Sequence, residues 1–431
     1  MDRKNTIRYV PLKNLEDKEL ARAFGYTEEN PRHSYAGMAG FEEAANKTDL
    51  TRYGQSAVKK GGAHAKKKDK KNEKKRSAGA TIGRFLRDTL LLFVALFMLA
   101  GATFYLLVGV GLSPRLQTLW VTTAMTTKDH KWLATAIVPE KKIREIMNRE
   151  TISDVGYDTN LEDKNGYIGW QMDEMEKEIN YTNAGYEKLE DGLYLKEVTG
   201  SGWHGFIMLV PDPKDLRLVD TPQQGVKGAS VRWMVENEGG IAGVNGGGFD
   251  DGPNYDSNGG VVSGLLIIDG KLINPSWDDS GLKYNMIGFN SDGRLILRHC
   301  TKEWALANDI RYAVSFSPFL IVNGEGTIPE GSSGGWGIAP RTAIGQRSTG
   351  EVLLLVIDGR QPTWSIGVDL DVLQKVLLEE GCENAAMMDG GSSTVMIYNN
   401  EFVNRPSLGH ERFINNCWVV MPHTEKPLWS Y

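Results

Sequence analysis

Residues 353–391 read LLLVIDGRQPTWSIGVDLDVLQKVLLEEGCENAAMMDGG and predict the architecture of the largest domain of the chain. An apolar strand ends at Asp358-Gly359-Arg360, and a second one ends at Asp389-Gly390-Gly391. Between them lies an amphipathic helix that Gly381 terminates, and its apolar face consists of Leu370, Leu373, Val376 and Leu377. The order strand, helix, strand predicts a crossover connection between parallel strands.

This crossover places Asp358 and Asp389 at the carboxyl ends of their strands. In open α/β sheets ligands bind at that edge, and the glycines that follow each Asp allow a substrate to approach the backbone closely. A competing interpretation is that both are turn residues, because Asp269-Gly270 and Asp292-Gly293 stand between apolar strands as tight hairpins do. Spacing alone leaves both interpretations open.

Short apolar runs broken by Gly, Asp and Asn continue through residues 200–422 and are typical of a sheet-rich domain. The chain has 431 residues, of which 41% are hydrophobic, so a sizeable core is available. We therefore predict an α/β domain, with a mixed sheet and helices, over residues 200–422, and a short C-terminal tail over residues 423–431.

A run of 24 residues without a charge, TLLLFVALFMLAGATFYLLVGVGL at 89–112, is long enough to cross about 30 Å of bilayer hydrocarbon. It is too long, and too far from the N-terminus, for a secretory signal peptide. Residues 59–76 before it hold ten Lys or Arg and two acidic residues, which predicts a cytoplasmic N-terminus and an extracytoplasmic domain after the helix. The prediction is a single-pass protein of the cell membrane, anchored through this one helix.

The segments on either side of that helix are expected to differ. Residues 1–88 are polar, basic and without apolar periodicity, which predicts a disordered cytoplasmic tail. Residues 113–199 are expected to form a helical stalk or N-terminal extension, because Ile143, Ile146 and Met147 follow helical spacing. Outside the basic stretch the chain is acidic, so we expect no nucleic-acid partner.

Cysteine, histidine and acidic residues give weaker signals. Three cysteines (Cys300, Cys382, Cys417) allow one disulfide with one thiol left over, and the histidines lack metal-ligand spacing. The segment FDDGPNYDSN offers oxygen ligands without the order of an EF-hand loop, so a Ca²⁺ site is a weak expectation with the candidate ligands Asp250, Asp251 and Asp256.

Four segments occur in an order that resembles the phosphodiester glycosidase family: GVNGGGFDDGPN (243–254), PRTAIGQRSTGEVLLLVIDGR (340–360), ENAAMMDGGSSTVMIYNNEFVNRPS (383–407) and ERFINN (411–416). The bacterial members of the family include proteins labelled for exopolysaccharide biosynthesis. The resemblance extends over roughly residues 200 to 422. It implies hydrolysis of a sugar 1-phosphodiester, or of a surface polysaccharide that contains one, at the bond between the anomeric carbon and the bridging oxygen.

The resemblance also implies roles for individual residues. Asp389 is expected to be the central carboxylate and Asp358 its partner. Arg341 and Arg360 are expected to clamp the phosphodiester, because a guanidinium matches phosphate oxygens bidentately. The remaining candidates for substrate binding or for orienting the carboxylates are Asn245, Thr342, Gly390, Gly391, Ser392, Ser393, Asn404 and Arg412.

Two other classes of function remain open at this stage. One is a metal-dependent phosphodiesterase that attacks phosphorus with a metal held in the loop of residues 250–258. The other is a non-catalytic glycan-binding scaffold of the cell envelope.

Overall fold

The computed structural model describes residues 65–127, 129–161, 174–252, 257–273 and 281–423, with the side chains described from residue 82 onward. The chain divides into two compact units, residues 1–82 and residues 83–431. The predicted tail over residues 1–64 and the C-terminal residues 424–431 lie outside the described part.

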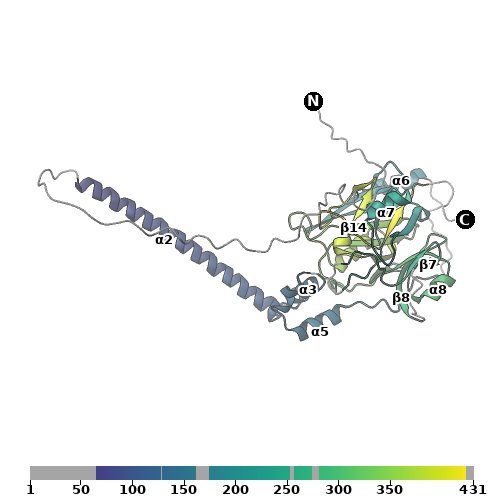
Figure 1. The fold of residues 1–431 in the computed structure, drawn as a ribbon, viewed down its shortest axis with the longest axis horizontal. Helices are drawn as coiled ribbons and strands as arrows, with labels where there is room; N and C mark the ends of the chain where they lie inside the picture. Colours follow the sequence, from purple (N-terminus) through teal and green to yellow (C-terminus); the bar gives the residue numbers. More distant parts are fainter. Residues whose placement is uncertain (1–64, 128, 162–173, 253–256, 274–280, 424–431) are drawn as a thin grey trace, which may run out of the picture. The chain divides into compact units, whose positions relative to one another are not determined.

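Helix α2 (Ala65–Phe104) contains most of the predicted membrane span and continues into a short π-helix, η1 (Tyr105–Gly109). Residues 82–109 are long and apolar enough to cross a membrane, by length and composition only, and few of them are buried. The prediction of disorder is wrong for residues 65–88, which are helical (Figure 1). Lys, Ala and Arg are good helix formers, and extending an existing helix is cheaper than nucleating one.

Three short helices follow: α3 (Pro114–Met125), α4 (Lys131–Thr135) and α5 (Glu140–Glu150). They enclose a small core that contains Val121, Ala134, Ile143 and Ile146, so the helix predicted from the Ile143 and Ile146 spacing is confirmed. Pro114 at the first turn of α3 suits a helix start, because its missing N–H would be unpaired there in any case.

The domain begins earlier than the predicted boundary at residue 200. Strands β1 (Glu187–Lys188) and β2 (Tyr194–Gly200) follow helix α6 (Glu174–Asn183), and β2 pairs along its full length with β3 (Trp203–Val210). Residues 113–199 are therefore only partly a helical extension. The sequence of β2 gives no apolar strand pattern, because this strand is polar and half-exposed, whereas β3 is strongly apolar.

The largest sheet has eight strands in the order β1-β2-β3-β14-β13-β15-β11-β12. Its remaining strands are β11 (Phe319–Val322), β12 (Glu325–Gly326), β13 (Arg341–Arg347), β14 (Val352–Ile357) and β15 (Cys382–Met387). Helix α9 (Leu370–Glu379) connects β14 to β15, as predicted. These two strands run parallel but are not neighbours, because β13 lies between them and pairs antiparallel with both. The expected parallel ladder is therefore replaced by antiparallel pairing.

Two five-stranded sheets complete the domain. One has the order β17-β16-β5-β18-β4 and the other the order β7-β6-β10-β8-β9. The first contains β4 (Leu216–Asp220), β5 (Ala242–Asn245), β16 (Met396–Tyr398), β17 (Glu401–Phe402) and β18 (Asn416–Val420), and helix α7 (Val231–Glu238) packs on it. The second contains β6 (Leu266–Ile268), β7 (Lys271–Leu272), β8 (Lys283–Asn290), β9 (Leu295–Thr301) and β10 (Ile310–Ser315), with α8 (Lys302–Ala307) beside it.

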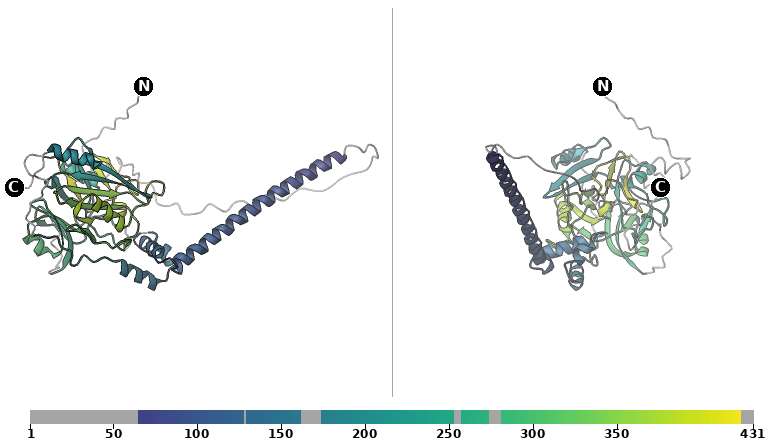
Figure 2. Two further views of the ribbon diagram at one scale, coloured as in Figure 1. Left: turned by 180° about the vertical axis from the view of Figure 1, so that it is seen from behind. Right: turned by 60° about the vertical axis from the view of Figure 1, so that its left-hand side comes forward.

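One apolar core joins all three sheets. Met208, Leu354, Trp418, Ile287 and Phe319, from different sheets, belong to a single buried cluster. Figure 1 labels β14 in the eight-stranded sheet and β7 and β8 in the second five-stranded sheet. Figure 2 shows the same domain from two further sides. The molecule thus combines helices with sheets, as predicted, but every strand pair among the described residues is antiparallel.

Both hairpin predictions are confirmed. Asp269-Gly270 connects β6 to β7 with positive φ at both residues, as a tight two-residue turn requires, and Asp292-Gly293 lies in the turn between β8 and β9. The disulfide that three cysteines would allow is not formed: all three cysteines are buried as free thiols.

Candidate functional site

The candidate site lies where strands of the large sheet meet the end of β5. Asp358 follows β14, Asp389 follows β15 shortly after its end, and β13 begins between them at Arg341. Because β14 and β15 both run opposite to β13, the carboxyl ends of two strands and the amino end of the third share one edge. The sequence prediction that the two Asp residues lie at one sheet edge therefore holds, although the strands are not adjacent.

Asn245 ties this edge to the neighbouring sheet. Its Nδ2 donates to the carbonyl of Asp389 at 2.6 Å, and its Oδ1 accepts from the Thr342 hydroxyl at 2.7 Å and from the Val395 amide at 3.2 Å. Both Asn245 and Thr342 are completely buried. Their polar groups are occupied within the protein, so they orient Asp389 rather than face a substrate.

The Asp389 carboxyl is partly buried and lies beside the short turn η4 (Gly391–Ser393). Burial raises its pKa to about 6, while Ser393, Arg412 and the Gly390 amide hold the pKa down and Asp251 raises it further. The Ser393 hydroxyl interacts with the Asp389 carboxyl, whereas the buried hydroxyl of Thr394 has no hydrogen-bond partner among the described residues. Buried polar groups are rarely left unpaired, so this turn has the character of a ligand site.

Arg360 supplies a cation to the same turn. Its backbone adopts φ 60°, which is uncommon for a residue other than glycine. A Cβ atom on residue 391 would lie 3.1 Å from Arg360 Nη2, so the guanidinium lies directly against the backbone of Gly391. Desolvation lowers the pKa of Arg360 and the charge of Asp389 opposes that shift. The side chain is exposed and makes no ion pair or hydrogen bond within the part of the chain described, which leaves its donors available for an anion.

Arg341 is held differently. It is 2% exposed and donates from Nε to the Val368 carbonyl at 3.1 Å, and from Nη2 to the carbonyls of Trp336 and Gly337 at 3.0 and 2.5 Å. Burial and the neighbouring charge of Arg360 lower its pKa to about 9. Arg341 is thus no freely moving clamp; it is a fixed positive charge beneath the turn that begins at Gly390.

Asp358 is saturated with donors. Its carboxylate accepts from Trp364 Nε1 at 2.8 Å, from Asn404 Nδ2 at 2.9 Å and from the Arg405 amide at 3.0 Å. Burial raises its pKa and these hydrogen bonds oppose the shift. With its oxygens engaged, Asp358 is better suited to hold the loops around residues 364 and 405 than to attack a substrate. Asn404 is its partner, not a free sugar-binding group.

Trp364 was not predicted from the sequence. Its ring stacks on His204, with centroids 3.9 Å apart, and the Arg405 guanidinium carbon lies 3.7 Å from its centroid. Both groups are too close to the ring centre to share one face, so they cover opposite faces. A Trp six residues after Asp358 in a Gly-containing loop is the only signal the sequence holds for this contact.

Arg412 closes the other side of Asp389. It forms a bidentate ion pair with Asp251, at 3.0 and 2.6 Å, and lies over the Phe249 ring at 4.7 Å. Burial raises the pKa of Asp251, but the hydrogen bonds and charge of Arg412, together with hydrogen bonds from Ser257, outweigh it and leave the pKa below its usual value. The oxygens of Asp251 are therefore committed to Arg412. Ser392 lies partly buried on the turn next to Asp389.

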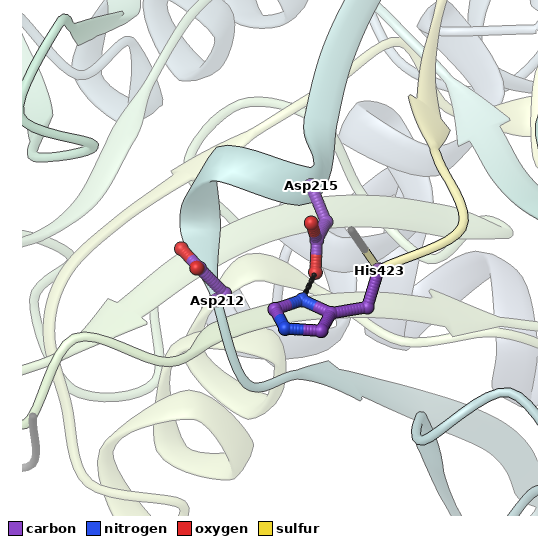
Figure 3. A group of neighbouring side chains, drawn as sticks. All are labelled: Asp212, Asp215 and His423. Atoms are coloured by element: carbon purple, nitrogen blue, oxygen red, sulfur yellow. Dashed lines mark hydrogen bonds and ion pairs between the residues drawn. The ribbon is translucent and has the colours of Figure 1, made fainter. Parts of the chain in front are cut away.

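The Ca²⁺ site expected in the 250–258 loop stays a prediction. The Asp250 side chain accepts from the Gly252 amide at 2.8 Å, and Asp256 lies outside the described residues. The structure places another group of metal-ligand side chains together: Asp212, Asp215 and His423, whose donor atoms lie within 4.8 Å of one another (Figure 3).

That second group has contacts of its own. Asp212 accepts from the Lys214 amide, and Asp215 accepts from His423 Nδ1 at 2.8 Å. Burial raises the pKa of Asp215 to about 6 although His423 opposes the shift. The group joins the start of β4 to the end of β18, away from Asp389, and within the described chain its contacts are those of a structural ion pair.

Comparison with known proteins follows the same segments. Residues 238–421 match the model of the phosphodiester glycosidase family. The chain contains a phosphodiester glycosidase domain. The match includes every predicted site residue and confirms the resemblance seen in the sequence, whereas strands β1 to β4 precede it.

Curated relatives match over shorter stretches. The chain is 36% identical over 81 residues to the SPbeta prophage-derived uncharacterized protein YomE of Bacillus subtilis, covering 19% of this chain and 12% of that protein. It is 28% identical to the N-acetylglucosamine-1-phosphodiester alpha-N-acetylglucosaminidases of Bos taurus, over 176 residues, and Homo sapiens, over 177 residues. Those matches cover 37% of this chain and 31% and 33% of the relatives, so the chain spans about a third of their length.

Among solved structures, the catalytic domain of the zebrafish enzyme of the same name, described as auto-inhibited by its pro-peptide, is 22% identical with a TM-score of 0.45. That similarity covers 54% of this chain and 82% of that domain.

Replacing Asp389 with Asn tests its environment. The pKa of Asp389 is raised to about 6 in the folded protein, so ionisation destabilises the fold as pH rises from about 4 to about 6. Asn removes that charge and fits the same turn, so near neutral pH the variant should be about 1 to 3 kcal/mol more stable by denaturant unfolding. The difference should vanish near pH 4.

Asp292→Asn is the matched control, because Asp292 is an exposed Asp-Gly turn residue, and its stability should change by less than about 0.5 kcal/mol. A less stable Asp389→Asn variant at neutral pH would mean that the Asp389 charge is a structural ion-pair partner.

Proposed function

We propose that this chain is a membrane-anchored extracytoplasmic hydrolase that cleaves the C1–O bond of sugar 1-phosphodiesters in surface glycopolymers or exopolysaccharide. One observation carries the proposal: the Arg360 guanidinium, which has no ion-pair or hydrogen-bond partner among the described residues, lies over Gly391 beside the partly buried carboxyl of Asp389. The family description of residues 238–421 supports the same chemistry.

Charge around the turn favours an anionic substrate. Arg360 and Arg341 are close enough for the charge of Arg360 to lower the pKa of Arg341, which Asp369 opposes, and the oxygens that accept from Arg341 are neutral carbonyls. Two neighbouring cations repel each other unless an anion lies between or beside them. A phosphodiester group on Arg360, above Arg341, would relieve that repulsion and fix the bridging oxygen near Asp389.

Asp389 then acts on the sugar. With a pKa of about 6 it is mostly ionised at neutral pH, and a carboxylate stabilises the positive charge that develops at the anomeric carbon or attacks that carbon. The electron pair of the C1–O bond passes to the bridging oxygen, and the phosphomonoester leaves. Water supplies the hydroxyl at C1 and releases a proton. A phosphate leaving group needs little acid assistance, so a single carboxylate whose oxygens are not all engaged in hydrogen bonds, that of Asp389, is sufficient. Asp358 holds the loops in place.

Hydrolysis in ¹⁸O-labelled water identifies the bond that breaks. The name of the mammalian relatives makes an α-linked N-acetylglucosamine 1-phosphodiester the first probe. We expect the label in the sugar and none in the phosphomonoester, by mass spectrometry of both products. EDTA should leave the rate unchanged, because Asp251 is paired with Arg412.

Label in the phosphate, with loss of activity in EDTA, would instead establish a phosphodiesterase that uses a metal. Glycan binding without turnover of any sugar phosphodiester would establish the scaffold class.

Arg360→Lys tests the anion site. Lys keeps the charge but loses the bidentate geometry, so kcat/KM on the phosphodiester should fall by about 10- to 100-fold. On a neutral aryl glycoside of the same sugar the loss should stay below about threefold, because no phosphate is bound. Arg311→Lys is the control, since Arg311 pairs with Asp269 in another sheet. Equal losses on both substrates would exclude a phosphate role for Arg360.

Protease protection tests the orientation. The basic segment before the apolar helix predicts that a protease added to intact cells removes the domain after Ser113 and spares the N-terminal segment. Immunoblots against tags at the two ends read out both segments, and detergent lysis is the control in which both are cleaved. A protected C-terminal domain would contradict the extracytoplasmic placement.

A further inference from the structure

Helix α3 is bound to the loop that precedes β13. The single proton of the Thr126 hydroxyl is shared between the Trp336 carbonyl at 3.1 Å and the Thr122 carbonyl of its own helix at 2.9 Å. The Ile338 amide donates to the Thr123 hydroxyl at 3.0 Å. Ser333 donates to the Thr122 hydroxyl at 3.1 Å. Two adjacent threonines in the last turn of α3, and the threonine that follows the helix, thus contact a single loop, residues 333–338.

The same loop holds Arg341. Of the three carbonyls that accept from its guanidinium, two belong to Trp336 and Gly337. The Trp336 carbonyl is shared, because it accepts from Thr126 of α3 and from Arg341 at once. A displacement of α3 therefore moves an acceptor of the buried arginine directly.

Packing leaves this loop little freedom. Gly337 has φ 59°, and a Cβ at that position would overlap the backbone of Thr123. The loop and the helix are in van der Waals contact at this point, so the loop follows the helix. On its other side Arg341 faces the site: a Cβ on Gly390 would lie 3.8 Å from its Nη1.

We propose that α3 is a positioning element of the site: through the carbonyls of Trp336 and Gly337 it orients the Arg341 guanidinium, and thereby sets the affinity for the phosphate of the substrate. This inference rests on the proposed function for the identity of the anion. Thr123, Thr126 and Gly337 are positioning residues that touch no substrate. The first helix after the apolar span is then part of the catalytic apparatus and more than a spacer.

Thr126→Val in the full-length protein is the first test. Val is isosteric and removes only the hydroxyl, so KM for the sugar 1-phosphodiester should rise about 3- to 10-fold, as expected for one lost hydrogen bond. The value of kcat should change by less than about twofold, and a neutral aryl glycoside should be unaffected. Thr127→Val is the control, because the Thr127 hydroxyl donates to the Ala124 carbonyl of α3 and, among the described residues, makes no hydrogen bond to the loop.

Gly337→Ala is the second test and should raise KM by more than about 10-fold, because the loop must move away from Thr123. Gly331→Ala is its control, since Gly331 also has positive φ but a Cβ there meets nothing within 4 Å. Circular dichroism and thermal unfolding verify that each variant is folded. If Gly337→Ala does not fold, the result for Thr126→Val alone decides the test.

The outcomes separate this inference from the proposed function. Wild-type turnover with both variants behaving like their controls would overturn the role of α3 and leave the function intact. If the wild type turns over no phosphodiester, the proposed function fails, and titration of inorganic phosphate into the same proteins decides the inference. Weaker phosphate binding by Thr126→Val than by Thr127→Val supports it, and equal binding overturns it.

Discussion

The side-chain amide of Asn245 is the contact on which the site depends. It stands at the end of β5 and joins the five-stranded sheet that contains β5 to the eight-stranded sheet. The contacts are with the Thr342 hydroxyl, the Val395 amide and the Asp389 carbonyl. Asp389 also donates its backbone amide to the Gly246 carbonyl at 3.1 Å, and the Gly247 amide donates to Asn416 Oδ1 at 2.8 Å. Since these groups are buried, each one left unpaired would cost about 1 to 3 kcal/mol, so the strand ends stay in one arrangement.

Two carboxylates in similar sequence contexts have different roles because their partners differ. Asp358 accepts from an indole, an amide side chain and a backbone amide, and it fixes the surrounding loops. Asp389 has fewer donors and lies near the guanidinium groups of Arg360, which has no partner among the described residues, and of Arg412, which is paired with Asp251. A partly buried carboxylate with few donors, beside a cation that has no partner among the described residues, is the pattern expected of a functional site.

The Arg341 guanidinium, the positive charge beneath the site, is held by residues that lie outside the site. Arg341 makes no ion pair among the described residues, and its orientation is imposed by carbonyls of Val368, Trp336 and Gly337. Two of these lie on the loop that α3 contacts. Because a guanidinium donates its hydrogen bonds in fixed directions, a rotation of the Arg341 side chain would change how it acts on a bound phosphate.

Local sequence patterns determined much of this protein: the apolar span, the hairpins at Asp269-Gly270 and Asp292-Gly293, the β14-α9-β15 connection and the ordered motifs of the phosphodiester glycosidase domain. Each of these depends on neighbours in the chain, through periodicity, turn conformation or helix capping. Only the tertiary structure decided that β13 separates the two Asp-bearing strands, that Asp251 is bound to Arg412, that Trp364 holds Asp358 and that α3 reaches Arg341. Those contacts join residues up to 215 positions apart, and pairing at that distance is set by how whole sheets pack, which local composition does not encode.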